Sequence, residues 1–265
     1  MPPELPEVET FVRGLAPAVG RTIASADVLD TRLAVTAEDI AGARIAAILR
    51  RGKYIRIELE DGRKLIVHLR MSGRLRFDCD ECERDYVRMV LHLDDGTAVY
   101  FVDPRRLGTA DVCEDGDDET LGVEPLGPQF TKAALRELAG RSRAPIKSFL
   151  LDQRKVAGIG NIYAAEALWQ ARIDPRRRAC ELSNVEVDRL HRAIVGVLGE
   201  AVSQLGTTLG SSVSDYRPTA AEGAMYQNHL AVYGREGEPC ERCGDPIERV
   251  IQAGRSTCFC PKCQR

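Results

Sequence analysis

The sequence predicts an α+β protein with a strand-rich first half, a helical second half and a cysteine-rich tail. Short apolar segments with strand-like alternation occupy residues 20 to 112, and helical apolar periods follow Gly127-Pro128. Five of the nine cysteines fall in the last 26 residues. We therefore expect three domains, at residues 1–128, 129–232 and 233–265.

The composition fits a globular protein without membrane segments. The chain has 265 residues and a net charge of −3, with 37 Lys and Arg against 40 Asp and Glu. It contains no run of about 18 uncharged apolar residues, and its opening MPPELPEVET lacks the basic and apolar regions of a secretory signal. We therefore expect a cytoplasmic location and no membrane partner.

The first half is predicted to contain one helix followed by strands. The helix begins at Pro6-Glu7, where acidic residues complement the helix dipole. Its apolar stripe consists of Val8, Phe11, Val12 and Leu15. The strand-like segments lie at 44–49, 53–59, 64–71, 87–93 and 97–102, with a hairpin turn at Asp95-Gly96.

Helical patterns dominate the second half. A capping box from Ser183 to Glu186 predicts the start of a long helix. Residues 145–172 predict two helices separated by a glycine turn at 157–161. The amides of that turn could cradle a phosphate, although a plain helix–helix turn explains it equally simply. The polar stretch 207–227 has no period and predicts a loop.

Positive charge is concentrated in two segments. Residues 51–76 carry eight Lys and Arg against three acids, and residues 141–178 carry nine against three. The compensating acids gather at 78–85 and 110–119. This segregation is typical of a phosphate-binding groove, but ordinary solvated faces would also produce it.

The cysteine tail predicts a structural zinc site. Cys240 and Cys243 form one C-x2-C pair, Cys260 and Cys263 form another, and sixteen residues separate the pairs. Two such knuckles at the ends of a hairpin can close a tetrahedral thiolate site, and four thiolates leave no open position for catalysis. A tail this short cannot bury a sufficient core, so the metal would supply its folding energy.

Other residues near or outside the ribbon remain ambiguous. Cys258 would break the symmetric spacing as a ligand, and the Cys79/Cys82 pair has no second pair beside it. The turn IQAGRST should hold Arg255 at the hairpin tip. There Arg255 could contact a phosphate or a minor groove, or it could be a solvated turn residue.

Several motifs together resemble one enzyme family. They are PELPEVET (3–10), RRGKY (50–54), HLRMSGRLR (68–76), DPRR (103–106), GIGNIYAAEAL (158–168) and the ribbon with AGRST. In this order they closely resemble the bacterial formamidopyrimidine-DNA glycosylase and endonuclease VIII family. The resemblance implies an N-terminal β-sandwich, a helix-two-turn-helix domain and a zinc ribbon. It also implies a monomer that acts on damaged double-stranded DNA at the nucleoid, with one Zn²⁺ and no small-molecule cofactor.

The resemblance also implies a catalytic chemistry. A terminal proline is a secondary amine that is partly unprotonated at neutral pH, because α-amino groups titrate near about 8. In the family it attacks C1′ of the damaged nucleoside, and the resulting iminium drives β- and then δ-elimination. The implied catalytic residues are Pro2 or Pro3 as nucleophile, Glu4 as proton shuttle, Lys53 in strand cleavage and Arg255 in δ-elimination.

By the same matching, six residues are expected to contact bent DNA. They are Met71, Arg84, Arg105, Leu107, Arg143 and Asn161. Met71 falls where a side chain fills the gap left by an everted base, because a base stacked in a duplex is out of reach. Its alternative is core packing at a strand end. His68 is expected to be a structural strand residue.

Three departures from the family pattern affect the expectations. The family begins Met-Pro-Glu, whereas this chain has Pro2 and Pro3 ahead of Glu4, so the nucleophile is either Pro2 or a Pro3 exposed by processing. Leu107 replaces a wedge phenylalanine and loses stacking on the opposite base. The stretch after GTTL, where many members carry a lysine or arginine and a DG turn, reads GSSVSDYRPTAAEGAMYQ and looks somewhat longer.

The function expected from these residues is excision of 8-oxoguanine and formamidopyrimidines, followed by strand cleavage. Two alternatives stay open. One is an endonuclease VIII-like preference for oxidised pyrimidines, and the other is a catalytically inactive zinc protein that binds damaged DNA. The surplus proline motivates the second alternative.

Overall fold

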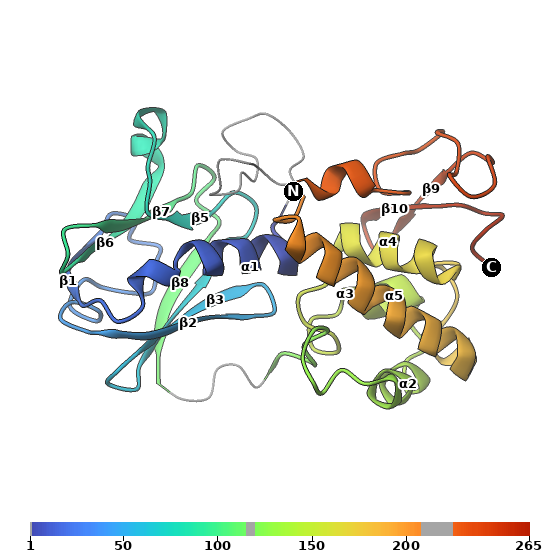
Figure 1. Ribbon diagram of the computed structural model, residues 1–265, viewed down its shortest axis with the longest axis horizontal. Helices are drawn as coiled ribbons and strands as arrows, with labels where there is room; N and C mark the ends of the chain where they lie inside the picture. The colour runs from blue at the N-terminus through green and yellow to red at the C-terminus, as the bar shows by residue number, and fades with distance from the viewer. Residues whose placement is uncertain (1, 115–119, 208–224) are drawn as a thin grey trace. The chain divides into compact units, whose positions relative to one another are not determined.

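The computed structural model describes residues 2–114, 120–207 and 225–265 (Figure 1). The chain forms two compact units. The first unit comprises Met1–Glu119 with Gln204–Gln227, and the second comprises Thr120–Ser203 with Asn228–Arg265. The three domain ranges expected from the sequence remain a prediction. Most of the loop predicted at 207–227 lies outside the described residues.

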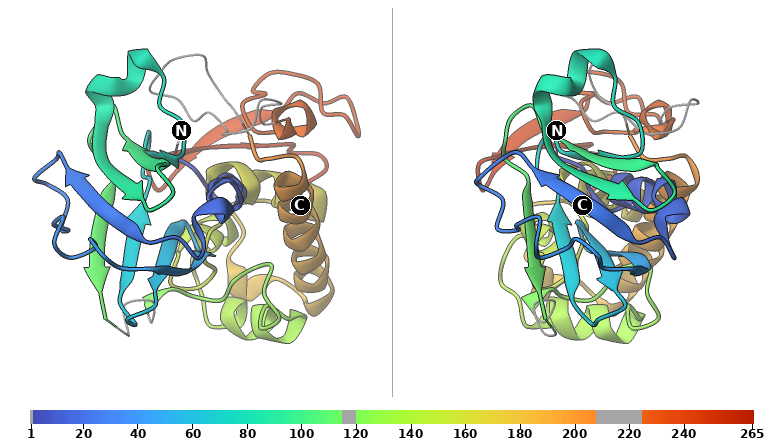
Figure 2. Two further views of the ribbon diagram at one scale, coloured as in Figure 1. Left: turned by 60° about the vertical axis from the view of Figure 1, so that its left-hand side comes forward. Right: turned by 90° about the vertical axis from the view of Figure 1, so that its left-hand side faces the viewer.

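Two four-stranded antiparallel sheets build the first unit, in the orders β1-β6-β7-β5 and β2-β3-β4-β8 (Figures 1 and 2). Apolar residues from both sheets share one core, which confirms the predicted β-sandwich. The strands are β1 (Ile23–Val28), β2 (Ile45–Arg51), β3 (Tyr54–Leu59), β4 (Lys64–His68), β5 (Arg74–Arg76), β6 (Val87–Leu93), β7 (Ala98–Val102) and β8 (Thr109–Cys113).

The predicted strand 64–71 is too long, because β4 ends at His68. Arg70 adopts a left-handed conformation with φ of 53°, which interrupts the extended chain. The amide of Gly73 then closes a tight turn by donating to the carbonyl oxygen of Leu69 at 2.9 Å. A Cβ atom on Gly73 would lie 2.5 Å from that oxygen, so only glycine fits.

The N-terminal helix α1 (Leu5–Gly14) begins one residue before the predicted start, with Glu4 as its N-cap. Val8, Phe11 and Leu15 are at most 1% exposed, and the helix packs against β2, β3 and β5. Its polar side is fixed by an ion pair of 3.0 Å from Arg50 to Glu9. Two 3₁₀ helices complete the unit's local structure, η1 (Ala16–Ala18) and η2 (Glu81–Tyr86).

Helices and one hairpin form the second unit (Figure 1). The predicted pair within 145–172 is confirmed as α3 and α4, and α4 packs against both α5 and β10. No helix in the described parts of the chain is long and apolar enough to cross a bilayer. The elements are α2 (Lys132–Gly140), α3 (Ile146–Leu151), α4 (Asn161–Ala171), η4 (Ala179–Glu181), α5 (Asn184–Ser203), β9 (Glu248–Gln252) and β10 (Arg255–Phe259). The short helix η5 (Tyr226–His229) begins in the first unit and ends in the second.

The predicted capping box at the start of α5 is present. The amide of Ser183 donates to the Glu186 carboxylate at 2.8 Å, and the Glu186 amide donates back to the Ser183 hydroxyl at 3.4 Å. The Arg177 guanidinium also binds this carboxylate. Together these bonds, with Arg177 contributing most, lower the pKa of Glu186 from 4.5 to about 2.

Because the folded pKa of Glu186 is depressed, its contribution to stability is complete above pH 4.5 and disappears as the pH falls towards 2. We expect Glu186→Gln to lower the free energy of unfolding by about 1 kcal/mol at pH 7 and by less than half of that at pH 3. Urea denaturation at both pH values measures this difference. Glu181→Gln, at an exposed position, is the control, and an equal loss for Glu186→Gln at both pH values would contradict the assignment.

Candidate functional site

Residues 2–4 are largely buried. Pro2 is half-buried, Pro3 is buried, and Glu4 is 1% exposed. The backbone amide of Glu4 donates to the Glu7 carboxylate at 2.8 Å in a reciprocal capping box. The two residues considered as nucleophile therefore precede a carboxylate whose position the helix fixes.

Glu7 links this chain start to a distant segment of the same unit. Its carboxylate, fully buried, also accepts a hydrogen bond of 2.8 Å from the amide of Thr207. The preceding Gly206 has φ of 80°, and a Cβ atom there would lie 2.7 Å from Glu7 Oε1. The sequence indicated only helix-start acidity for Glu7, because no local pattern reveals a partner 200 residues away.

Lys53 lies in the turn between β2 and β3, next to Gly52. It is half-buried, and its charge reaches the ring of His68 on the neighbouring strand. Burial, with the charges of Arg70 and Lys53, lowers the pKa of His68 to about 3. Since His68 Nδ1 also accepts the Arg70 amide hydrogen, His68 is a neutral structural residue at physiological pH.

The remaining candidates of the first unit lie in its loops and 3₁₀ helix. Met71 is half-buried in the turn between β4 and β5. Arg105 is exposed and Leu107 is 44% exposed in the connection from β7 to β8. Arg84 is exposed in η2. Cys79 is half-buried in the adjoining loop, and the side chain of Cys82, the other cysteine of this C-x2-C, lies outside the description.

In the second unit, the glycine turn opens a helix as predicted. Gly160 is the N-cap of α4, and Asn161 is its first residue. The side-chain oxygen of Asn161 is buried without a hydrogen-bond partner among the described residues. Such an atom is costly unless a ligand or water satisfies it. Arg143 is exposed between α2 and α3.

Arg255 occupies the predicted place at the tip of the β9–β10 hairpin. The tip is a two-residue turn, Ala253-Gly254, in which both residues have positive φ. Arg255 follows directly and is exposed. The strand behind it is held by Lys147 of α3, whose ammonium donates to the Ser256 carbonyl at 2.9 Å and the Thr257 hydroxyl at 2.8 Å.

A buried carboxylate anchors the segment that leads into this hairpin. Glu166 of α4 accepts backbone hydrogen bonds of 2.8 to 3.1 Å from Ala231, Val232 and Tyr233. Burial raises the pKa of Glu166, and the three amide donors oppose this effect. No local pattern pointed to Glu166 or Lys147, because their partners lie 65 or more residues away.

The four predicted cysteines form a compact cluster. Their sulfur atoms all lie within 4.8 Å of one another, with 4.0 Å between Cys240 and Cys263 and 3.5 Å between Cys243 and Cys260. Tetrahedral coordination with Zn–S bonds of about 2.3 Å needs sulfur atoms about 3.8 Å apart. The donor set therefore fits one structural zinc ion. Cys258 is buried in the small ribbon core but outside this cluster.

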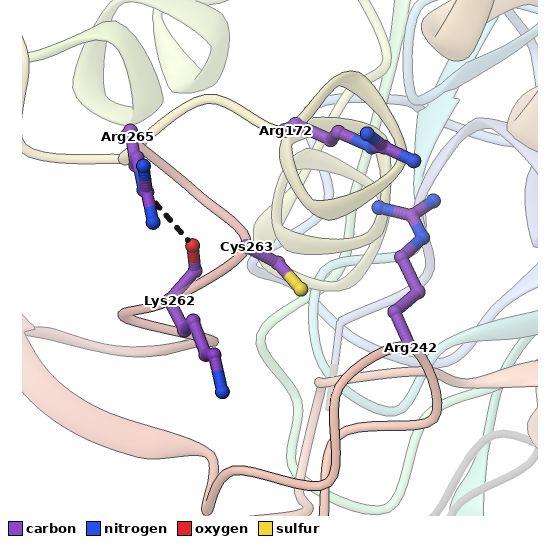
Figure 3. Close-up of a pocket in the computed structure, with 5 residues that line it drawn as sticks. All are labelled: Arg172, Arg242, Lys262, Cys263 and Arg265. Atoms are coloured by element: carbon purple, nitrogen blue, oxygen red, sulfur yellow. Dashed lines mark hydrogen bonds between the residues drawn. The ribbon is translucent and has the colours of Figure 1, made fainter.

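Positive side chains lie beside Cys263 of the thiolate cluster. They line a cavity of about 470 Å³ next to Cys263 and are Arg172, Arg242, Lys262 and Arg265 (Figure 3). Figure 3 shows the guanidinium groups of Arg172 and Arg242 pointing toward one another. Four thiolates and one Zn²⁺ carry two net negative charges, so this arrangement offsets the charge of the metal site. Arg242 is further fixed by stacking on Trp169, 3.6 Å from the ring centroid.

Comparison with known proteins gives matches along nearly the whole chain. Residues 1–110 match the formamidopyrimidine-DNA glycosylase N-terminal domain, and residues 121–213 match the H2TH domain of the same enzyme. Residues 237–265 match the zinc finger found in FPG and IleRS. The chain belongs to the formamidopyrimidine-DNA glycosylase family. Members of this family are base-excision-repair DNA glycosylases, and the family's zinc finger coincides with the four-cysteine cluster.

Individual relatives and solved structures agree with the family. The formamidopyrimidine-DNA glycosylases of Chloroflexus aurantiacus and Paracoccus denitrificans are 44% and 42% identical, and each comparison covers 99% of this chain and at least 97% of the relative. The crystal structure of the MutM (FPG) protein from Thermus thermophilus has a TM-score of 0.90 at 42% identity, covering 99% of this chain and 98% of that one.

A structure with DNA also has the same fold. The complex between the Lactococcus lactis Fpg and an abasic site containing DNA has a TM-score of 0.87 at 34% identity. It covers 99% of both chains.

Proposed function

We propose that this family member removes oxidised purines, such as 8-oxoguanine and formamidopyrimidines, from double-stranded DNA and then cleaves the strand as an AP lyase. The ordered chain start carries this proposal. Glu4 and Glu7 are buried carboxylates, and burial of charge is costly unless hydrogen bonds or a function retain it. Here the capping box fixes Glu4, a group able to move protons, directly after the two prolines in the chain.

In the proposed reaction the terminal proline nitrogen attacks C1′ and the damaged base leaves with a proton. Glu4 is the proposed proton shuttle to the opening sugar ring. The iminium that forms withdraws electrons and acidifies the C2′ proton. Loss of that proton expels the 3′ phosphate, and a second elimination expels the 5′ phosphate. The nitrogen belongs to Pro2 or Pro3, depending on which residue is the mature terminus.

Cationic side chains would contact the DNA phosphates during these steps. We assign phosphate contact and strand cleavage to Lys53, and δ-elimination to Arg255. Arg255 suits contact with a phosphate because it is exposed on a rigid hairpin and cannot lose its charge. Arg84, Arg143 and the unsatisfied Asn161 carboxamide are proposed contacts to the backbone or bases.

Met71, Arg105 and Leu107 would fill the space left by the everted base. The side chain of Leu107 supports this role because an apolar group that is 44% exposed can enter a base stack without unpacking the core. The protein would act as a monomer at the nucleoid, and without a small-molecule cofactor.

Lesion preference is tested by single-turnover excision from two matched duplexes. We expect 8-oxoguanine opposite cytosine to be released at least about tenfold faster than thymine glycol. The same enzyme preparation and the same flanking sequence serve for both duplexes. Faster release of the oxidised pyrimidine would instead support an endonuclease VIII-like specificity. Binding of both duplexes without release of either base would support the inactive DNA-binding alternative.

A further inference from the structure

We propose that Asp103 is a positioning residue that holds the two inserting segments of the first unit, residues 71–72 and 105–108, at a fixed separation. The inference rests on the proposed insertion of Met71, Arg105 and Leu107 into DNA. Its basis is a single carboxylate, 1% exposed, that is shared by both segments.

One oxygen of Asp103 shapes the connection from β7 to β8. Oδ2 accepts hydrogen bonds of 2.7 Å from the backbone amides of both Leu107 and Gly108. A Cβ atom on Gly108 would lie 2.5 Å from the Phe101 ring and 3.1 Å from this oxygen. Glycine at this position therefore lets the chain fold back tightly against the carboxylate.

The other oxygen reaches the second segment. Oδ1 accepts a hydrogen bond of 2.5 Å from the Ser72 hydroxyl and one of 3.2 Å from the Arg105 amide. Ser72 is itself 1% exposed and directly follows Met71. Because both segments bind one rigid carboxylate, a displacement of Met71 must be accompanied by a displacement of the Arg105–Leu107 connection.

An ion pair also fixes the direction of that connection. Arg106 has a left-handed backbone with φ of 52°, and its guanidinium donates to both oxygens of Asp30 at 2.7 and 2.8 Å. These hydrogen bonds hold the pKa of Asp30 well below its usual range. Arg106 is thus held to Asp30 although it is exposed, and its neighbours Arg105 and Leu107 are exposed as well.

Pre-organisation of this kind matters because the side chains must fill the gap in the base stack before the everted base returns to it. Segments that moved independently would have to be ordered on the DNA, at a cost in conformational entropy. The Asp103 hydrogen bonds order both segments when the protein folds, so this entropy is not lost again on binding DNA. Their loss should slow insertion and leave the initial, charge-driven binding of DNA unchanged.

The test removes the Ser72 hydroxyl, which donates to Asp103 and also accepts a long hydrogen bond of 3.4 Å from the Arg105 amide, and it follows insertion without chemistry. Ser72→Ala deletes the donor from the 71–72 segment and leaves the carboxylate in place. The probe is a duplex with a tetrahydrofuran abasic analogue opposite 2-aminopurine, whose fluorescence rises when a side chain unstacks it. We expect insertion by Ser72→Ala to be about tenfold slower, the effect expected for a lost buried hydrogen bond, with unchanged initial affinity for the duplex.

Two further variants complete the experiment. Ser142→Ala removes a similarly buried hydroxyl from the second unit and should insert at the wild-type rate. Asp103→Asn cannot accept all four hydrogen bonds and should be slower than Ser72→Ala. Insertion at the wild-type rate by Ser72→Ala would overturn the proposed positioning role. If the wild-type protein itself gave no fluorescence rise, the proposed insertion of Met71 and its neighbours would fail instead.

Discussion

Blocking the terminal proline nitrogen with preceding residues is expected to lower the rates of base excision and strand cleavage by roughly a thousandfold or more. Insertion of Leu between Met1 and Pro2 would keep the initiator methionine in place. Acylation turns the proline nitrogen into an amide whose lone pair is delocalised, so it cannot attack C1′. Single-turnover release of 8-oxoguanine measures the loss.

Two matched chains make this experiment specific. A leucine added after Arg265 controls for the extra residue and should leave the rate unchanged. Deletion of Pro2 places Pro3 directly after the methionine, as in the family pattern. Full activity of this deletion would show that the Pro3 nitrogen can react once it is terminal, and a large loss would show that Pro2 is needed. Full activity of the N-terminally extended chain would contradict amine catalysis.

Removal of one zinc ligand is expected to have the second large effect. Cys240→Ser should release the zinc ion and weaken binding to abasic duplex by about a hundredfold, because the metal supplies most of the folding energy of the ribbon. The ribbon core has few apolar residues, and the four sulfur atoms form its centre. Metal analysis and a binding titration at fixed salt measure the two changes.

Cys258→Ser is the matched control, since Cys258 lies in the same hairpin but outside the cluster. It should keep one zinc ion per chain and bind DNA normally. The β-sandwich should retain its own unfolding transition in both variants. Unchanged DNA affinity in Cys240→Ser would show that the ribbon is dispensable for binding.

Local signals in the sequence predicted the elements that local chemistry determines. The capping box from Ser183 to Glu186, the hairpin tip before Arg255 and the helix opening at Asn161 were all identifiable. In each case the residues that define the structure are within a few positions of one another. The four-cysteine spacing similarly predicted a cluster that the structure contains.

Long-range polar contacts could not be predicted in this way. Lys147 counted only as one charge in a basic segment, yet it holds the strand behind Arg255. Asp103 follows an apolar strand and precedes a proline, but its bond to Ser72 depends on how β5 and β7 pair. The roles assigned to the catalytic and DNA-contacting residues remain predictions from the family resemblance.

Bonding of the terminal imino nitrogen to deoxyribose underlies every proposed step of catalysis. Incubation with abasic duplex and borohydride reduces the iminium to a stable amine, and mass spectrometry of the digested adduct locates the added sugar. We expect the modification on the nitrogen of the N-terminal proline, whether this is Pro2 or Pro3. Attachment to Lys53, or the absence of any adduct despite full cleavage of the DNA, would contradict the proposed mechanism.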